Sequence, residues 1–120
     1  MNDHLDTQAL QAITALQRPG KPDLLKRVLG LFESESPKSL LQIQTGLAEQ
    51  DIEKIRFGSH SLKSSSANVG AMLLSQRCKE LEAAARSGDL SQCQQLEEDL
   101  IELHQLAVKA LQAYQQDQAA

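Results

Sequence analysis

The sequence predicts an all-α fold, an antiparallel up-and-down four-helix bundle with a short N-terminal helix lying over one end as a lid. β-Branched residues are sparse, whereas Leu, Ala, Gln, Glu and Lys, which favour helices, are abundant. Apolar residues recur at helical spacing in segments separated by short breaks, and no segment alternates as a strand would. At 120 residues the chain is one domain, and we expect its ends, 1–4 and 115–120, to be frayed.

The N-terminal helix is predicted over about residues 6–17. Its short apolar stripe consists of Leu5, Leu10, Ile13 and Leu16. Two prolines and a glycine within residues 18–22 end it, because neither residue type continues a helix well. A helix this short cannot hold a core alone, so we expect it to lie across one end of the bundle.

The second helix is predicted to begin near Pro22, with Asp23 placing negative charge at the positive end of the helix dipole. Its inward-facing residues are Leu25, Val28, Leu29, Phe32, Leu40, Ile43 and Leu47. Pro37 removes a backbone hydrogen bond and clashes with the preceding turn. Composition and spacing therefore leave open either a kink near Pro37 or two successive helices.

The last three helices are predicted to be joined by short breaks. Asp51 caps the third, which ends between Asn68 and Gly70; Ala71 opens the fourth, which runs to about Ser87. Gly88 is the expected C-terminal cap of the fourth helix, and Asp89 starts the fifth. Their buried faces are predicted to hold Ile52, Ile55, Ser59, Leu62, Ser66 and Val69, then Leu74, Cys78, Leu81 and Ala85, then Leu90, Cys93, Leu96, Leu100, Leu103, Ala107, Ala110, Leu111 and Tyr114.

Composition excludes several classes of function. The formal net charge is −4 with no long basic cluster, so nucleic-acid binding is not expected. The longest apolar run, residues 71–74, is far too short to span a membrane. Asp3 and Asp6 stand where a secretory signal would be basic and apolar, so we expect a cytoplasmic protein. Met1 and the compact length favour a free-standing protein over an excised module.

The two cysteines, Cys78 and Cys93, lie at apolar helix positions. We expect reduced thiols packed in the core, because no Cys-x-x-Cys or Cys-plus-His spacing suggests a metal or redox site. Neither G-x-x-x-x-G-K-S/T nor G-x-G-x-x-G occurs, so the sequence offers no nucleotide-binding motif.

His60 is the candidate reactive group. At about 100° per residue it lies roughly 135° from the centre of the third helix's apolar stripe, so it faces solvent. Phe57, Ser61, Ser64 and Asn68 share its side of the helix. Lys63 follows one turn later, between His60 and the buried edge. An exposed histidine among small side chains, with a cation nearby, is suited to reacting with a partner.

The segments H-S-L-K at 60–63, S-A-N-V-G-A at 66–71 and C-K-E-L-E at 78–82 resemble the histidine-containing phosphotransfer (Hpt) domain of multistep phosphorelays. The sequence departs from that family at Ser64, where most members carry glycine. The resemblance implies a phosphocarrier without its own kinase or phosphatase machinery. His60 would accept a phosphoryl group from a receiver-domain aspartate and pass it to another. It also favours one bent helix across Pro37.

Partners and further site residues are implied in the same way. The partners would be response-regulator receiver domains and a hybrid sensor histidine kinase, with Mg²⁺ in the receiver, no cofactor or metal in this chain, and a monomeric state. Lys63 would offset charge on the transferring group. Glu82 would accept a hydrogen bond from the inner ring nitrogen of His60, and Arg86, one turn later, would add a cation. The docking patch would comprise Arg56, Phe57, Ser61, Ser64 and Asn68.

Other interpretations stay open. The chain could be a non-phosphorylated helical adaptor, a degenerate Hpt domain that binds a receiver or kinase. A bundle metalloprotein is disfavoured, because the predicted stripes hold neither Glu nor His. Glu82 and Arg86 could be a surface ion pair, and Phe57 could lie beneath the lid. The serines at 64–66 are best explained by packing at a bundle seam. His4 and His104 are expected to be solvated bystanders.

Overall fold

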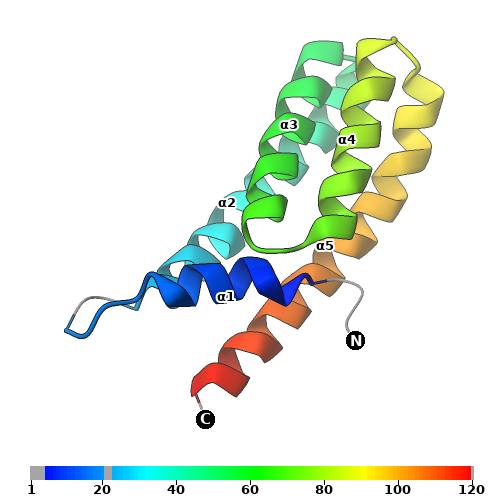
Figure 1. The fold of residues 1–120 in the computed structure, drawn as a ribbon. Helices are drawn as coiled ribbons and strands as arrows, with labels where there is room; N and C mark the ends of the chain where they lie inside the picture. Colours follow the sequence, from blue (N-terminus) through cyan, green and yellow to red (C-terminus); the bar gives the residue numbers. More distant parts are fainter. Residues whose placement is uncertain (1–4, 21–22, 120) are drawn as a thin grey trace.

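The computed structural model describes residues 5–20 and 23–119, and the regular structure within them is entirely α-helical. The helices are α1 (Thr7–Ala15), α2 (Leu24–Glu49), α3 (Ile52–Asn68), α4 (Met72–Arg86) and α5 (Leu90–Ala119). In Figure 1, α2 to α5 run up and down beside one another, and α1 crosses the end of the bundle below the turn between α3 and α4. The predicted bundle with a lid helix is confirmed.

Aspartates mark the start of most of these helices. The side chains of Asp6, Asp23, Asp51 and Asp89 each accept a hydrogen bond from a backbone N–H in the first turn that follows. Such a cap satisfies a donor that has no partner within the helix. The caps predicted at Asp51 and Asp89 are therefore present, and Gly88 has the positive φ of +79° expected of a residue that ends a helix. α4 has no side-chain cap at Ala71.

Pro37 lies within one continuous helix, α2, so the alternative of two successive helices is wrong. The proline is exposed, which lets its ring stand on the solvent side. The bend predicted there stays a prediction. α2 begins at Leu24 behind its cap Asp23, and Pro22 lies outside the described residues.

The core follows the predicted stripes closely. Ile55, Leu62, Leu81 and Leu100 are completely buried, and so are both cysteines. The thiols of Cys78 and Cys93 are free, as expected. Burial raises the pKa of Cys78 to about 12, so this thiol stays protonated and unreactive at neutral pH.

Two glycines bring α2 and α3 close together. A Cβ atom at Gly58 of α3 would lie 2.9 Å from both Ile43 Cγ1 and Ser39 O of α2. A Cβ at Gly46 of α2 would lie 3.0 Å from Ile55 Cγ1 of α3. The contacts at Gly58 are shorter than a real Cβ atom makes, and the contact at Gly46 is tighter than most, so the helix that carries His60 depends on these glycines for its close packing against α2.

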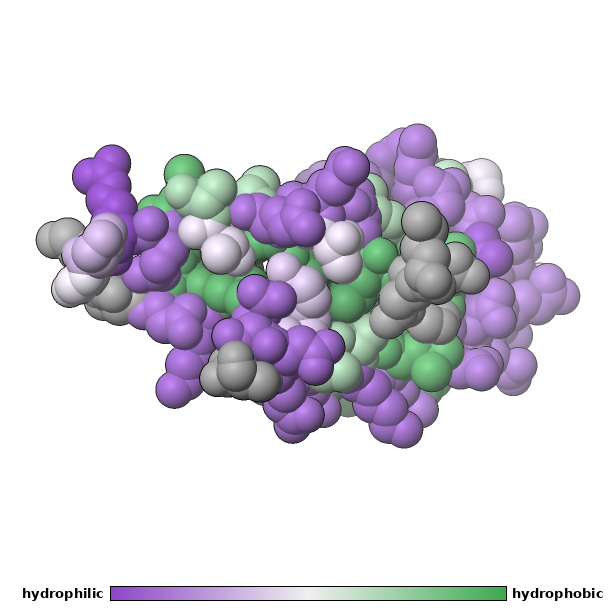
Figure 2. Space-filling view, turned by 60° about the horizontal axis from the view of Figure 1, so that its bottom comes forward, coloured by the Kyte–Doolittle hydropathy of each residue, from purple (hydrophilic) through white to green (hydrophobic). Residues whose placement is uncertain are grey.

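The lid is joined to the turn between α3 and α4. The Asp6 N–H donates a 2.6 Å hydrogen bond to the carbonyl oxygen of Gly70, and Leu5 and Leu10 are buried. Figure 2 views this end of the molecule and shows apolar side chains along the middle of the face, between polar rims. Leu16, predicted on the buried stripe, is instead 69% exposed, because α1 ends at Ala15 and Leu16 already belongs to the turn.

Three other expectations need correction. His104 is not a solvated bystander: it is 8% exposed, because it lies four residues after Leu100 and three before Ala107 on the buried face of α5. Of the seam serines only Ser66 is buried, whereas Ser64 is exposed. α5 continues to Ala119, beyond the expected fraying from 115, because helix-favouring Gln and Ala follow the partly buried Tyr114. His4, residues 1–4 as a whole and Ala120 lie outside the described residues.

No helix in the part of the chain that the structure describes has both the length and the apolar character required to cross a lipid bilayer.

Candidate functional site

His60 lies in the middle of α3 with 65% of its side-chain surface exposed, as its angular position predicted. The opposite face of the same turns packs into the bundle: Ser59 and Leu62, on either side of it, are completely buried. The Ser59 hydroxyl donates to the backbone carbonyl oxygen of Ile55 at 2.7 Å, so no polar group of that side chain is left over. The imidazole therefore stands in solvent on a rigid helix.

Glu82 of α4 holds this imidazole from the side. Its Oε2 lies 2.8 Å from His60 Nδ1, and its Oε1 accepts a 2.7 Å hydrogen bond from Lys63 Nζ. Only 11% of the Glu82 side chain is exposed, so its carboxylate is more buried than a surface ion pair with Arg86 would be. This contact is the one hypothesised from the sequence, and it brings together residues 22 positions apart.

The charge of Glu82 decides which nitrogen of the neutral His60 ring carries the proton. Burial by itself raises the pKa of Glu82. The hydrogen bonds from Lys63 and His60 and the positive charge of Lys63 together lower it by more than burial raises it, so the pKa lies below its ordinary value. An ionised carboxylate only accepts hydrogen bonds, so His60 Nδ1 must carry the proton. In the neutral ring the other nitrogen, Nε2, then keeps its lone pair and is the nucleophilic atom.

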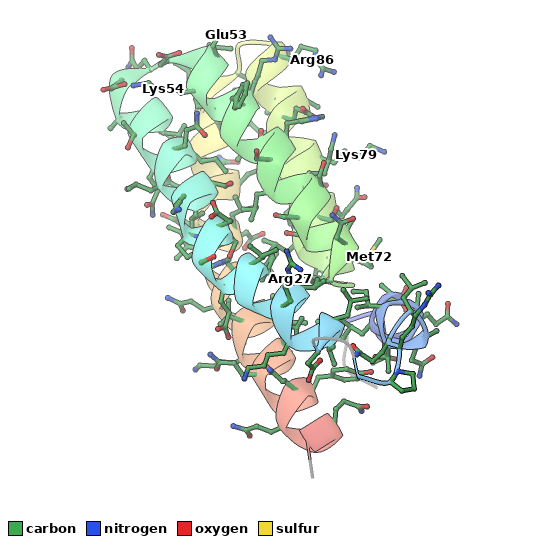
Figure 3. All side chains as sticks on the ribbon, turned by 90° about the vertical axis from the view of Figure 1, so that its left-hand side faces the viewer. Arg27, Glu53, Lys54, Met72, Lys79 and Arg86 are labelled. Atoms are coloured by element: carbon green, nitrogen blue, oxygen red, sulfur yellow. The ribbon has the colours of Figure 1, made fainter. Side chains whose placement is uncertain are left out.

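A hollow of about 350 Å³ lies beside the imidazole, between α3 and α4. Its lining residues are Glu53, Arg56, Phe57, His60, Ser61, Glu82 and Arg86. Glu53 and Arg86 lie near each other at one end of the bundle in Figure 3, whereas Lys79 lies further along α4. The hollow thus brings together most of the residues proposed on the two helices, whereas Lys63, Ser64 and Asn68 do not line it.

The two arginines of this hollow are placed differently. Arg56 Nη1 donates to Glu53 Oε1 at 2.8 Å, while its Nε is buried and has no hydrogen-bond partner among the described residues. Arg86 makes no ion pair with any residue in the described ranges, 5–20 and 23–119. The alternative that Glu82 pairs with Arg86 is therefore wrong, because both carboxylate oxygens already bind His60 and Lys63.

Comparison with known proteins agrees with this geometry. The sequence profile of the Hpt domain family matches residues 27–116, which is most of the chain. The chain belongs to the Hpt domain family. Hpt proteins are phosphocarriers that work with histidine kinases and response-regulator receivers.

This Hpt domain is similar to one curated protein in sequence and to one solved structure in fold. It is 34% identical over 76 residues to histidine-containing phosphotransfer protein 1 of Arabidopsis thaliana, a match over 62% of this chain and 49% of that protein. The chain therefore spans about half the length of the curated relative that it matches. The crystal structure of histidine-containing phosphotransfer protein B (HptB) from Pseudomonas aeruginosa PAO1 superposes with a TM-score of 0.86 at 29% identity, covering 95% of this chain and 96% of that one.

The predicted docking residues of the Hpt domain form one exposed face around His60. Phe57 is 69% exposed, so the alternative that it lies beneath the lid is wrong. Ser61, Ser64 and Asn68 are exposed on the same side of α3, and Arg56 is partly exposed. Exposed aromatic surface beside a reactive group is typical of a protein-binding site.

The sequence analysis did not predict a second cavity, an apolar groove next to this face. A groove of about 370 Å³ between α2 and α3 is lined by Val28, Leu31, Phe32, Glu35, Ser65, Asn68 and Val69. Leu31 is 55% exposed. The available signal was that Leu31 is a large apolar residue outside the buried stripe of α2.

In the described part of this Hpt domain, no group of three or more His, Cys, Asp or Glu side chains is placed to hold a metal ion.

Proposed function

We propose that this Hpt domain is a phosphorelay intermediate, which accepts a phosphoryl group on His60 from a receiver-domain aspartate and passes it to the aspartate of another receiver. The observation that carries this proposal is the 2.8 Å contact of His60 Nδ1 with the Glu82 carboxylate on an otherwise exposed ring. One ring nitrogen is engaged by the protein, and the other is free for a partner.

The transfer step requires no reactant besides His60 and the aspartyl phosphate of the receiver. The lone pair of His60 Nε2 attacks the phosphorus of the aspartyl phosphate, the N–P bond forms, and the P–O bond to the aspartate breaks. The electron pair of that bond leaves with the aspartate carboxylate. The Nδ1 proton stays on the ring, which becomes positively charged while it carries the phosphoryl group. Glu82 lies next to that proton and stabilises the charge, and the reverse sequence delivers the group to the next aspartate.

The receiver domain supplies the phosphoryl donor and the Mg²⁺ that neutralises the oxygens of that donor. The Hpt domain contributes the nucleophile, its tautomer and the docking surface. No cofactor of its own enters the proposal, and one monomer presents all of these groups.

The docking surface is the face formed by Arg56, Phe57, Ser61, Ser64 and Asn68. Phe57 provides the largest exposed apolar area next to His60. Arg86, which makes no ion pair within the described ranges, adds positive charge beside His60, and this suits an acidic partner pocket. The partners proposed are the receiver of a hybrid sensor kinase and that of a response regulator, in the cytoplasm.

Incubation with a phosphorylated receiver tests the proposal. We expect label on the Hpt domain that is acid-labile and base-stable, as a phosphohistidine is, and none on a His60→Gln variant. Label retained by that variant would refute transfer through His60. A wild-type domain that binds the receiver but takes no label would identify the chain as a non-phosphorylated adaptor instead.

A further inference from the structure

Lys63 is bound to Glu82 and does not stand free beside the reactive nitrogen. Its Nζ lies 2.7 Å from Glu82 Oε1, and its side chain is 29% exposed, compared with 65% for His60. Glu82 uses its other oxygen, Oε2, for His60 Nδ1. The three side chains therefore form a chain of contacts, in which one carboxylate separates the ammonium group from the imidazole.

We infer that Lys63 is a positioning residue, which promotes phosphoryl transfer through the Glu82 carboxylate and not by contact with the transferring group. The inference rests on the proposed function of His60. It replaces the charge-offset role that the sequence suggested for Lys63 with a specific route of action.

The phosphoryl group travels to and from Nε2, whereas Lys63 is held at the carboxylate that binds Nδ1, on the protein side of the ring. A rotation of Lys63 away from Glu82 and towards a phosphoryl oxygen would break this hydrogen bond. That would leave a carboxylate with only 11% of its side chain exposed facing the ring without its cation, which is costly.

Burial favours the neutral carboxylic acid of Glu82, and Lys63 is the largest opposing influence. Lys63 thus favours the ionised form of Glu82, and an ionised Glu82 keeps the proton of His60 on Nδ1. A protonated Glu82 could donate to Nδ1 instead, which would move the ring proton to Nε2 and remove the nucleophilic lone pair.

Other cations nearby do not perform this task. Lys79 and Arg86 are on α4, three residues before and four after Glu82, yet within the described ranges neither makes an ion pair with it. Both side chains are exposed. Lys79 therefore offers a matched control: a lysine close to Glu82 in sequence that does not contact its carboxylate.

The experiment is a double-mutant cycle on phosphoryl transfer from a phosphorylated receiver, measured as a function of pH. Lys63→Met should lower the rate by about tenfold near neutral pH and move the acid limb of the profile to higher pH. In a Glu82→Gln background, where the side chain cannot ionise, Lys63→Met should change the rate less than about twofold. Lys79→Met should leave both the rate and the profile as in the wild type.

An equal loss from Lys63→Met in both backgrounds, with an unmoved acid limb, would show direct action on the phosphoryl group and overturn the inference. Failure of the proposed function is recognised separately, since a wild-type domain would then take no label on His60. Ring ¹⁵N chemical shifts of His60 give a readout that needs no transfer. The Nδ1–H tautomer should dominate in the wild type and in Lys79→Met, and lose population to Nε2–H in Lys63→Met; unchanged shifts in Lys63→Met would also overturn the inference.

Discussion

Ser36 Oγ and His104 Nε2 lie 2.8 Å apart inside the bundle and join α2 to α5 across 68 residues of sequence. Both side chains are buried, with exposed fractions of 1% and 8%. The ring of Phe32 lies beside the histidine, at a centroid distance of 6.1 Å. A buried polar pair that satisfies itself specifies how two helices align, because any shift would leave both groups without a partner.

The first prediction is that His104 makes stability depend on pH in mildly acidic solution. Burial lowers the pKa of His104 below its ordinary value of 6.5, so the unfolded chain takes up a proton before the folded one does. Stability is therefore complete above about pH 6.5 and declines as the pH falls below it. Denaturant unfolding at several pH values measures this, with a Ser36→Ala/His104→Leu double variant as control. Equal slopes between pH 6.5 and 5 in both proteins would contradict the prediction.

The second prediction concerns the close contact of α2 and α3. Gly58→Ala should destabilise the domain by about 1–3 kcal/mol, because its Cβ would collide with Ile43 and the Ser39 carbonyl. Gly30→Ala is the matched control: nothing lies within 4 Å of its Cβ, so it should stabilise α2 by about 0.5–1 kcal/mol. Chemical denaturation of both variants checks the opposite signs, and a stabilised Gly58→Ala would show that the helices are less tightly packed than described.

The third prediction is that Phe57→Ala weakens receiver binding without weakening the fold. Its ring is 69% exposed, so the free energy of unfolding should change by less than about 0.5 kcal/mol. Loss of a central aromatic contact should raise the receiver's Kd by roughly tenfold. Leu41→Ala, which removes a side chain that is 61% exposed on α2 outside the docking face, should leave the Kd unchanged. Similar affinities for the wild type and Phe57→Ala would place the docking site elsewhere.

The fourth prediction concerns Arg86. This arginine lines the hollow beside His60 and pairs with no carboxylate in the described part of the chain, so its charge is available to a partner. Arg86→Ala should slow association with the receiver and make the association rate less sensitive to salt. Stopped-flow measurements between low and physiological ionic strength test this. Lys109→Ala, on α5 and outside the hollow, controls for net charge, and an identical salt dependence in Arg86→Ala and wild type would refute the role.

The helices and their order follow from local pattern, because capping by Asp51 and Asp89 and the spacing of apolar residues act within a few turns. His60 was placed on the solvent side by its angle alone. Residue polarity predicts the wrong environment for His104. A polar side chain is expected in solvent, but its spacing from Leu100 puts His104 on the buried stripe of α5. The hydrogen bond with Ser36 makes that burial tolerable.

By itself the sequence determined an all-helical bundle, an exposed His60 with Lys63 one turn away, and the exposed face of α3 around them, since each depends on helical periodicity. Only the tertiary structure decided that Glu82 binds both His60 and Lys63, that Arg86 pairs with no carboxylate in the described part of the chain, and that Gly58 sets the distance between α2 and α3. The physical reason is that these contacts join separate helices. Which side chains meet there depends on how closely and in what register the helices pack, and no periodicity within one helix contains that information.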